Sequence, residues 1–396
     1  MESSRIIKEC RMSRKPFTLY GMTASLYTAK VRAYMRQQNI PFREVAPGRD
    51  EFTQNVLPEV GRWIIPVVKT PEGRLFQDGI HILDYLEESG EAKTSLQCDS
   101  SLMQVIAHVF ELFGNEGLLR PAMHYRWNFD QENLDFIRTT FADGLPEGLA
   151  PEQKEGAFLL ASGRMRKAAV AFGVTAETIP AIEQSYTEFL DLLEAHFQDT
   201  PYLLGGRATI GDYGLFGPLS AHLGRDPYPL ALMQKNAPHV FRWIERMNAP
   251  HDYIDHIQGA QGTDLFQDHK IPGTLTALMR YVAEEYLPEI TAHVDHANGW
   301  LARRPDLEAG TNGLDDPAAR TIGMCTFTWR GQSLTSAVMP YRFYVLQRLQ
   351  DHFDGGADPA RKTMLSVLTE THLEPLLRVR TTRRVERKNH LEVWGK

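Results

Sequence analysis

Hydroxyl side chains gather near the N-terminus, where a short apolar run gives way to a helical pattern. The apolar run ends at Gly21, and Thr23, Ser25 and Tyr27 follow it. A hydroxyl at such a turn can cap the helix, or it can donate a hydrogen bond to a thiolate that the helix dipole also stabilises. Thiols titrate near ~8.5 and are mostly protonated at neutral pH, so a donor of this kind favours the nucleophilic thiolate. Ser25 is placed for this role, and Thr23 and Tyr27 are alternative donors.

Two further motifs bring a turn and a charge to the ends of predicted elements. Pro66 interrupts the apolar stretch "IIPVV", and Asp78 directly precedes Gly79 and the helical pattern "GIHILDYLEES". An aspartate in this place is a good N-cap, and the N-terminus of a helix binds carboxylates through its free N–H groups. The sequence therefore predicts that Asp78 caps a helix that begins at Gly79.

The elements that must position these residues form one compact pattern. Apolar runs predict strands at about 17–21, 40–47, 64–70 and 74–78, and helical periodicity predicts helices at 26–39 and 79–89. The stretch "TPEG" has proline second and glycine fourth, which is typical of a type I turn and joins the last two strands as an antiparallel hairpin. The order β-α-β-α-β-β-α predicts a mixed sheet with helices on both faces.

The next part of the chain, about 101–250, is helical. Glu116, Arg120 and His124 recur at a four-residue step and are expected to share a face of a helix that Pro121 breaks or bends. Arg120 or His124 could polarise a carbonyl or hold a carboxylate, and a polar network between domains explains the same residues equally well. Thr209 with Asp212 three places later is a variant of the capping box, and we assign this pair to stability.

Beyond residue 250 the character changes. A Gly-rich linker precedes a long helix at about 274–302, a hairpin that turns at Arg330 and Gly331, and two more helices. His293 and His296 have a possible metal spacing but lack a clear third ligand, so we expect a solvated helix face and no metal. The basic run at 378–388 could touch nucleic acid or an acidic partner; we interpret it as a solvated edge strand protected by positive charge.

Three of these motifs, taken in order, resemble the glutathione S-transferase superfamily. They are "LYG" with Ser25 and the downstream "KVR", "IIPVV" with "FQDGIHILDYLE", and "YLLGGRATIGDYGLF". The resemblance implies an α+β multidomain protein: a thioredoxin-like glutathione-binding domain at 16–92, after a polar leader at 1–15, and an all-α domain at 100–250. It covers about 16–250, so an α+β extension with a hairpin, at 262–396, lies outside the two-domain pattern.

The resemblance also implies roles for the motif residues. Ser25 matches the catalytic serine or cysteine position, and with serine the mixed-disulfide chemistry of cysteine-bearing relatives is disfavoured. Pro66 matches a cis-proline that turns the backbone of Ile65 toward the cysteinyl part of glutathione, and Tyr27 lies nearby. Asp78 and Gly79 would hold the γ-glutamyl group. Relatives usually carry a serine where Gly79 stands, so one contact, worth roughly 1 kcal/mol, is missing here.

In this family the first long helix of the all-α domain borders the second-substrate pocket, which gives Glu116, Arg120 and His124 a candidate role there. The extension could cover that pocket, or it could occupy the surface that usually forms the homodimer. A homodimer is therefore possible but is a weaker inference than the fold.

Composition limits the class of protein. The net charge of -7 argues against a general nucleic-acid partner. No apolar stretch approaches the ~20 residues of a membrane span, and the polar N-terminus lacks the apolar core of a signal peptide. Three widely spaced cysteines are typical of free thiols in a reducing compartment. These features predict a cytoplasmic protein with no membrane partner.

The motif residues and the family resemblance together predict a transferase of the detoxification kind. Glutathione would be its co-substrate, no metal would be needed, and the thiolate would attack a small, largely apolar electrophile. The alternative is a non-catalytic binding or scaffold protein on the same fold, which Gly79 and the extension favour. A metal-dependent hydrolase is a remote third hypothesis.

Overall fold

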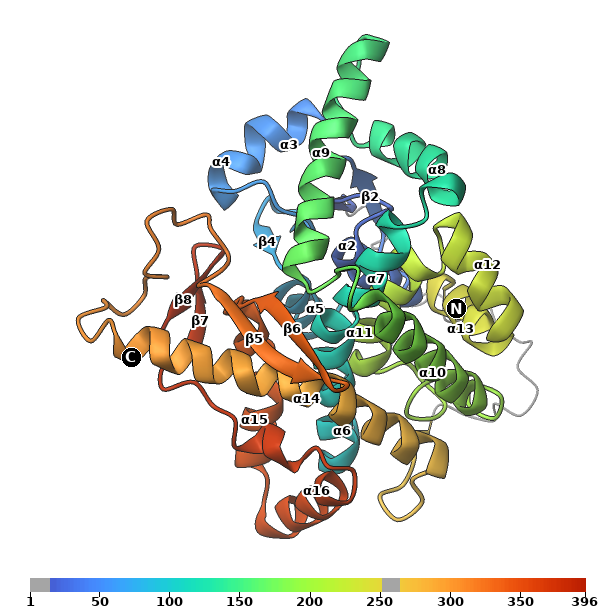
Figure 1. Ribbon diagram of the computed structural model, residues 1–396, viewed down its shortest axis with the longest axis vertical. Coiled ribbons are helices and arrows are strands. Elements are labelled where there is room, and N and C mark those ends of the chain that lie inside the picture. The colour runs from blue at the N-terminus through green and yellow to red at the C-terminus, as the bar shows by residue number, and fades with distance from the viewer. Residues whose placement is uncertain (1–14, 251–263) are drawn as a thin grey trace, which may run out of the picture.

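The computed structural model describes residues 15–250 and 264–396. The polar leader predicted at 1–15 and much of the predicted linker therefore lie outside the described residues. The predicted fold class is confirmed: a mixed sheet with helices, a helical region, and a C-terminal α+β part follow one another along the chain. In Figure 1 the orange and red C-terminal part lies against the helices that precede it.

The N-terminal sheet has the strand order β2-β1-β3-β4. Its strands are β1 (Phe17–Tyr20), β2 (Phe42–Val45), β3 (Val67–Lys69) and β4 (Leu75–Gln77). β1 and β2 are parallel, and the other two pairs are antiparallel. The predicted turn between β3 and β4 is present, since the N–H of Gly73 donates to the carbonyl of Thr70 at 3.0 Å. The sequence prediction of a mixed sheet with a hairpin is therefore confirmed.

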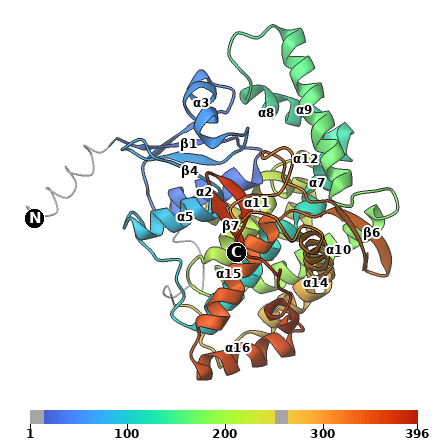
Figure 2. The same ribbon diagram turned by 90° about the vertical axis from the view of Figure 1, so that its left-hand side faces the viewer.

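Helices cover both faces of this sheet. Alternate side chains of a strand point to opposite faces, so neighbouring residues pack against different helices. Leu19 and Val68 belong to the core that contains α2 (Leu26–Gln37) and α5 (Gly79–Glu88). Their neighbours Tyr20 and Val67 pack instead with the short helices α3 (Asp50–Asn55) and α4 (Leu57–Val60). Figure 2 shows α3 on one side of the sheet and α2 and α5 on the other.

The middle of the chain is helical, as predicted. Its elements are α6 (Ser101–Leu112), a π-helical segment (Phe113–Gly117), α7 (Leu119–Trp127), α8 (Asp130–Asp143), α9 (Pro151–Ala171), α10 (Ile179–Phe197), α11 (Ile210–Pro218), a second π-helical segment (Leu219–Leu223), α12 (Pro227–Asn236) and α13 (Pro238–Asn248). The capping box is also present, because Asp212 Oδ2 accepts from the N–H of Thr209 at 2.9 Å.

The predicted break is present, but it lies a few residues before Pro121. The helix changes at the π-helical segment, and Pro121 lies inside the first turn of α7. Gly114 in that segment packs directly on α11, where a Cβ built on Gly114 would stand 2.3 Å from the carbonyl carbon of Gly214. The irregular segment thus lies at a close backbone crossing between helices that are far apart in the sequence.

The C-terminal part is built on a long helix and two hairpins. Its elements are α14 (Gly273–Ala302), β5 (Met324–Trp329), β6 (Gln332–Ala337), α15 (Tyr341–Gly355), α16 (Asp358–Glu370), a 3-10 turn (Glu374–Leu377), β7 (Val385–Lys388) and β8 (Leu391–Trp394). The hairpin turn predicted at Arg330 and Gly331 is present, with φ values of 47° and 74° at those residues. One buried core runs from Phe17 to Trp394, so this part shares its core with the preceding domains.

The strand that we predicted in the basic run is present as β7, and it belongs to a second hairpin. β7 pairs with β8, and Asn389 and His390 form the turn between them with φ values of 49° and 63°. Arg387 and Glu392 are cross-strand partners whose side chains are only 3% and 9% exposed. Glu386 and Lys388 of β7 are exposed, whereas the Arg387 side chain between them is covered. The predicted solvated strand is therefore present, but only one of its faces meets solvent.

Candidate functional site

Ser25 is the N-cap of α2. Its Oγ accepts a hydrogen bond from the backbone N–H of Thr28 at 3.2 Å, and the side chain is half-buried. A serine hydroxyl carries one donor and two acceptor lone pairs. The cap uses an acceptor, so the O–H proton remains able to donate. The capping role and the predicted thiolate-donor role are therefore compatible.

Four of the residues predicted to bind glutathione line one cavity. Tyr27, Ile65, Pro66 and Asp78 come from the start of α2, the segment before β3 and the start of α5. The peptide bond between Ile65 and Pro66 is cis, as the resemblance implied. Ser25 and Gly79 do not line this cavity. The fold therefore brings together residues that are up to half a domain apart in the sequence.

Asp78 is the charged residue of this cavity on the N-terminal side. It is buried, and its backbone has a φ of 86° immediately before α5. Its Oδ1 accepts a hydrogen bond of 2.5 Å from the hydroxyl of Tyr341, the first residue of α15. Burial first, and then the charge of Asp78, raise the pKa of Tyr341 well above 10, so this hydroxyl keeps its proton and donates it. Asp78 Oδ2 has no hydrogen-bond partner among the described residues.

Gly79, the residue after Asp78, is buried at the first turn of α5. A Cβ built there would meet the side chains of Lys30 and Val31 at 3.7 Å, which is ordinary van der Waals contact. Space therefore does not exclude the serine that relatives usually carry. The surrounding packing therefore does not explain why glycine stands here in place of serine.

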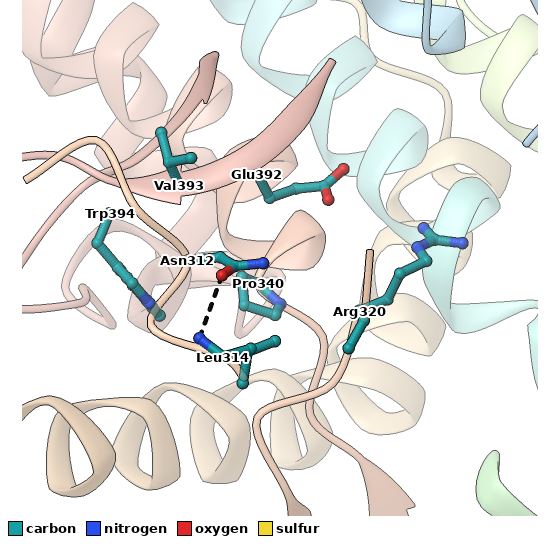
Figure 3. Close-up of a pocket in the computed structure, with 8 residues that line it drawn as sticks. Asn312, Leu314, Arg320, Pro340, Glu392, Val393 and Trp394 are labelled. Carbon is teal, nitrogen blue, oxygen red and sulfur yellow. Dashed lines mark hydrogen bonds between the residues drawn. The ribbon is translucent and has the colours of Figure 1, made fainter. Parts of the chain in front are cut away.

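The other wall of the cavity comes from the C-terminal part, which sequence reasoning did not assign to the site. Arg320, Tyr341, Arg387 and Glu392 complete the lining, together with Ile64 and Gln77. Figure 3 shows Arg320 and Glu392 at a smaller neighbouring cavity, where both side chains extend toward the same side. The two cavities share these two residues.

A buried ion cluster holds this wall to the N-terminal domain. Arg62, which precedes the cis-proline segment, donates to both carboxylate oxygens of Glu392 at 3.0 and 3.1 Å and to the carbonyl of His390 at 3.1 Å. Arg387 also donates to Glu392 at 2.5 Å and forms a hydrogen bond to Gln77. Burial raises the pKa of Glu392. The hydrogen bonds from Arg62 and the charge of Arg387 lower this pKa by a larger amount, so that it falls to about 2.

The free volume of the cavity is about 30 Å³. A single water needs roughly 10–15 Å³ on this measure, whereas sites for small molecules usually measure about 300–1,000 Å³. In the described conformation, side chains of the C-terminal part thus fill the place predicted for a tripeptide.

The residues predicted for a second-substrate pocket separate into two groups. Glu116 accepts from Arg342 Nε at 3.1 Å, and Arg120 donates to Glu289 at 2.5 Å. Arg342 also donates to Glu289, which links the two pairs into one buried network. These contacts match the alternative of a polar network between domains. His124 lies apart from this network, bonded to Glu183 at 3.0 Å and Asn128 at 2.8 Å.

His293 joins the same network, so the expectation that it lies on a solvated helix face is wrong. Its Nε2 is 2.9 Å from Ser336 Oγ, and its Nδ1 is 3.0 Å from Arg342. Burial first, and then the charge of Arg342, lower the pKa of His293 to about 3.

Across 15–250 and 264–396, no cluster of three or more His, Cys, Asp or Glu side chains has an arrangement that would hold a metal ion. Likewise, none of the helices in these two ranges is both long and apolar enough to span a bilayer.

Comparison with solved structures finds glutathione transferases and a beta-etherase at low identity. The beta-etherase LigF from Sphingobium sp. strain SYK-6 is 18% identical, with a TM-score of 0.43 over 59% of this chain and 96% of that one. Glutathione transferase GSTFuA3 from Phanerochaete chrysosporium is 15% identical, with a TM-score of 0.42 over 61% of this chain and 100% of that one. Comparison with curated proteins finds no match.

Two family models match the chain itself. The glutathione S-transferase N-terminal domain matches residues 19–94, and the glutathione S-transferase C-terminal domain matches residues 176–246. The first segment runs from the end of β1 past α5, and it contains the cavity residues Tyr27, Ile65, Pro66 and Asp78. The second contains the capping box and α11. Two segments of the chain thus match glutathione S-transferase N- and C-terminal domain models, in that order, and a further α+β segment follows them.

Proposed function

We propose that this protein binds glutathione in its N-terminal domain and activates the thiolate for attack on a small, largely apolar electrophile. The observation that carries the proposal is the single cavity lined by Ile65, Pro66 and Asp78 beside the N-terminus of α2. The matching domain models support the same ligand. A cytoplasmic location and a homodimer stay predictions of the sequence.

In this mechanism each group acts on a different part of the peptide. Ser25 donates its free O–H to the sulfur at the positive end of α2, which favours the thiolate. The backbone of Ile65 pairs with the cysteinyl unit, Asp78 faces the ammonium of the γ-glutamyl group, and the N–H groups at the start of α5 receive its carboxylate. The sulfur then forms a bond to an electrophilic carbon. In a substitution that carbon releases its leaving group with the bonding electron pair, and in an addition the neighbouring atom that receives the displaced electron pair takes up a proton.

Calorimetric titration with glutathione tests the role of Ser25. Wild type should bind with release of a proton at neutral pH and with less release at mildly alkaline pH, because the free thiol already ionises there. Ser25→Ala should lose the proton release, while Ser25→Thr, which keeps both the cap and the O–H, should retain it. Thr23→Val removes a neighbouring hydroxyl as a control. Loss of proton release in Thr23→Val but not in Ser25→Ala would contradict the assignment.

A second titration tests the γ-glutamyl site through Gly79. Gly79→Ser restores the hydroxyl that relatives carry, and the 3.7 Å contacts of its Cβ leave room for it. One added hydrogen bond to a charged group should tighten glutathione binding by about tenfold. Gly79→Ala adds the Cβ alone and should bind glutathione like wild type. Equal affinity in the serine and alanine variants would mean that the carboxylate lies elsewhere.

A non-catalytic binding or scaffold protein is the second candidate function. The small free volume, about 30 Å³, favours it, because side chains of the same chain already fill the site. If wild type, Gly79→Ser and the Tyr341 variant described below all fail to bind millimolar glutathione, the transferase proposal is overturned and this alternative stands.

A further inference from the structure

The C-terminal segment forms hydrogen bonds to residues that we predict to bind glutathione, or to their neighbours in the chain. The hydroxyl of Tyr341 donates to Asp78, the carboxylate assigned to the ligand's ammonium. Arg387 binds Gln77, which directly precedes Asp78 in the chain. These bonds join residues that are 263 and 310 positions apart in the sequence. The extension therefore stands in the site as an internal occupant.

The internal occupant satisfies the site only in part. Tyr341 offers Asp78 a single O–H, and Asp78 Oδ2 stays buried without a partner among the described residues. An ammonium carries three N–H donors and a full positive charge, so it can serve both oxygens with stronger, charge-assisted bonds. A ligand ammonium would thus hold Asp78 better than the tyrosine hydroxyl does.

The hairpin β7–β8 has an anchored end and a polar end. At the anchored end Trp394 is buried and stacks near Trp300 and Phe343, which are core residues of α14 and α15. At the other end the exposed turn residue Asn389 lies beside His390, whose carbonyl accepts from Arg62. The contact between Arg62 and the turn end of the hairpin is therefore polar. This end can move while Trp394 stays in place.

We propose that Tyr341 and the hairpin β7–β8 form a latch on the glutathione site, which must open before a ligand enters. The latch pairs Tyr341 with Asp78 and clamps Glu392 between Arg62 and Arg387. The identity of the displacing ligand, glutathione with its γ-glutamyl ammonium, rests on the function proposed above. The closed state itself rests on the contacts alone.

Two tyrosines of α15 provide a matched pair of variants. Tyr341→Phe removes the O–H that occupies Asp78. Tyr344→Phe removes an O–H that lies 2.7 Å from His81 Nε2, also in α5, but outside the cavity lining. Calorimetry should show glutathione affinity raised about tenfold in Tyr341→Phe, the equivalent of one hydrogen bond to a charged group. Tyr344→Phe should bind like wild type. Equal affinity in all three proteins would overturn the latch.

Hydrogen exchange of the wild-type amides tests the latch without any ligand. The latch predicts that amides of β7 and β8 exchange through local opening, faster than those of α14, and faster still in Tyr341→Phe. Saturating glutathione should speed their exchange further. Local opening without any glutathione binding would support the latch and overturn the proposed ligand. Exchange of the hairpin only at the rate of global unfolding, in both proteins, would overturn the latch itself.

Discussion

The buried carboxyl of Glu116 gives a sharp test of the electrostatics between the N-terminal site and the C-terminal part. Its Oε2 accepts from Arg342, and its Oε1 has no hydrogen-bond partner among the described residues. Burial raises the pKa of Glu116 from 4.5 to about 7, because the opposing charges of Arg342 and Arg320 offset it only in part. Arg342 also donates to Glu289, so two buried carboxylates share its charge.

The sign of the effect on stability follows from where the proton is bound. Between pH 4.5 and about 7 the folded protein holds a proton on Glu116 that the unfolded chain has released. Stability is therefore present in full below pH 4.5 and is lost as the pH rises through this window. At about 1.4 kcal/mol per pKa unit, the loss over the window is about 3 kcal/mol.

The perturbation is Glu116→Gln, which keeps the shape and the acceptor toward Arg342 but cannot release a proton. We expect the variant and wild type to have similar free energies of unfolding at pH ~4.5, and the variant to be more stable by about 3 kcal/mol above pH ~7. Urea unfolding, followed by tryptophan fluorescence across this range, measures the difference. Taking the difference between the two proteins removes the titrations that they share.

Glu111→Gln is the matched control, since Glu111 is a buried glutamate one turn and a half earlier in the chain. Burial raises its pKa, but the charges of Lys30 and Arg348 lower it by more, to well below 4.5. Its stabilisation is present at neutral pH and is lost as the pH falls. Glu111→Gln should therefore cost more stability at neutral than at acid pH, opposite to Glu116→Gln. Parallel pH profiles for wild type and Glu116→Gln would refute the reasoning.

Two further predictions concern the contacts between domains. Glu289→Gln should cost about 3–5 kcal/mol of unfolding free energy, because it leaves two buried arginines without their shared carboxylate, whereas exposed Glu284→Gln on the same helix should change it by less than about 0.5 kcal/mol. Gly114→Ala should destabilise by about 1–3 kcal/mol or more, since its Cβ would meet the backbone of Gly214 at 2.3 Å. Gly156→Ala, which meets nothing within 4 Å on α9, should instead stabilise by about 0.5–1 kcal/mol. Chemical unfolding monitors all four; equal values for either pair would contradict the packing argument.

The features that the sequence predicted correctly are mainly those set by near neighbours in the chain. The turn at Gly73 and the turn at Arg330 and Gly331 follow from two or three residues that must adopt particular backbone angles. The Thr209 capping box needs a spacing of three. In each case the partner lies within one turn, so the pattern in the sequence contains the whole interaction.

The predictions that the structure corrects depend on partners far away in the sequence. Pro121 is a conspicuous helix breaker, yet the first turn of a helix tolerates proline because its N–H has no partner there. The irregular segment lies where Gly114 crosses Gly214, and only the assembled helices show that crossing. His293 likewise looked solvated until Arg342 and Ser336 were brought beside it.

The contribution of the C-terminal part to the cavity also depends on partners far away in the sequence. Taken alone, the basic run at 378–388 predicts a solvated strand, because isolated charges avoid burial. In the fold, the cross-strand register places Glu392 beside Arg387, and the N-terminal domain adds Arg62 on the other side. A carboxylate held by two guanidinium groups can be buried where a lone charge cannot. Burial of the Glu392 carboxylate thus required Arg62, which is 330 positions away and precedes the cis-proline segment. The C-terminal part is therefore one wall of the site, and any account of ligand entry has to include it.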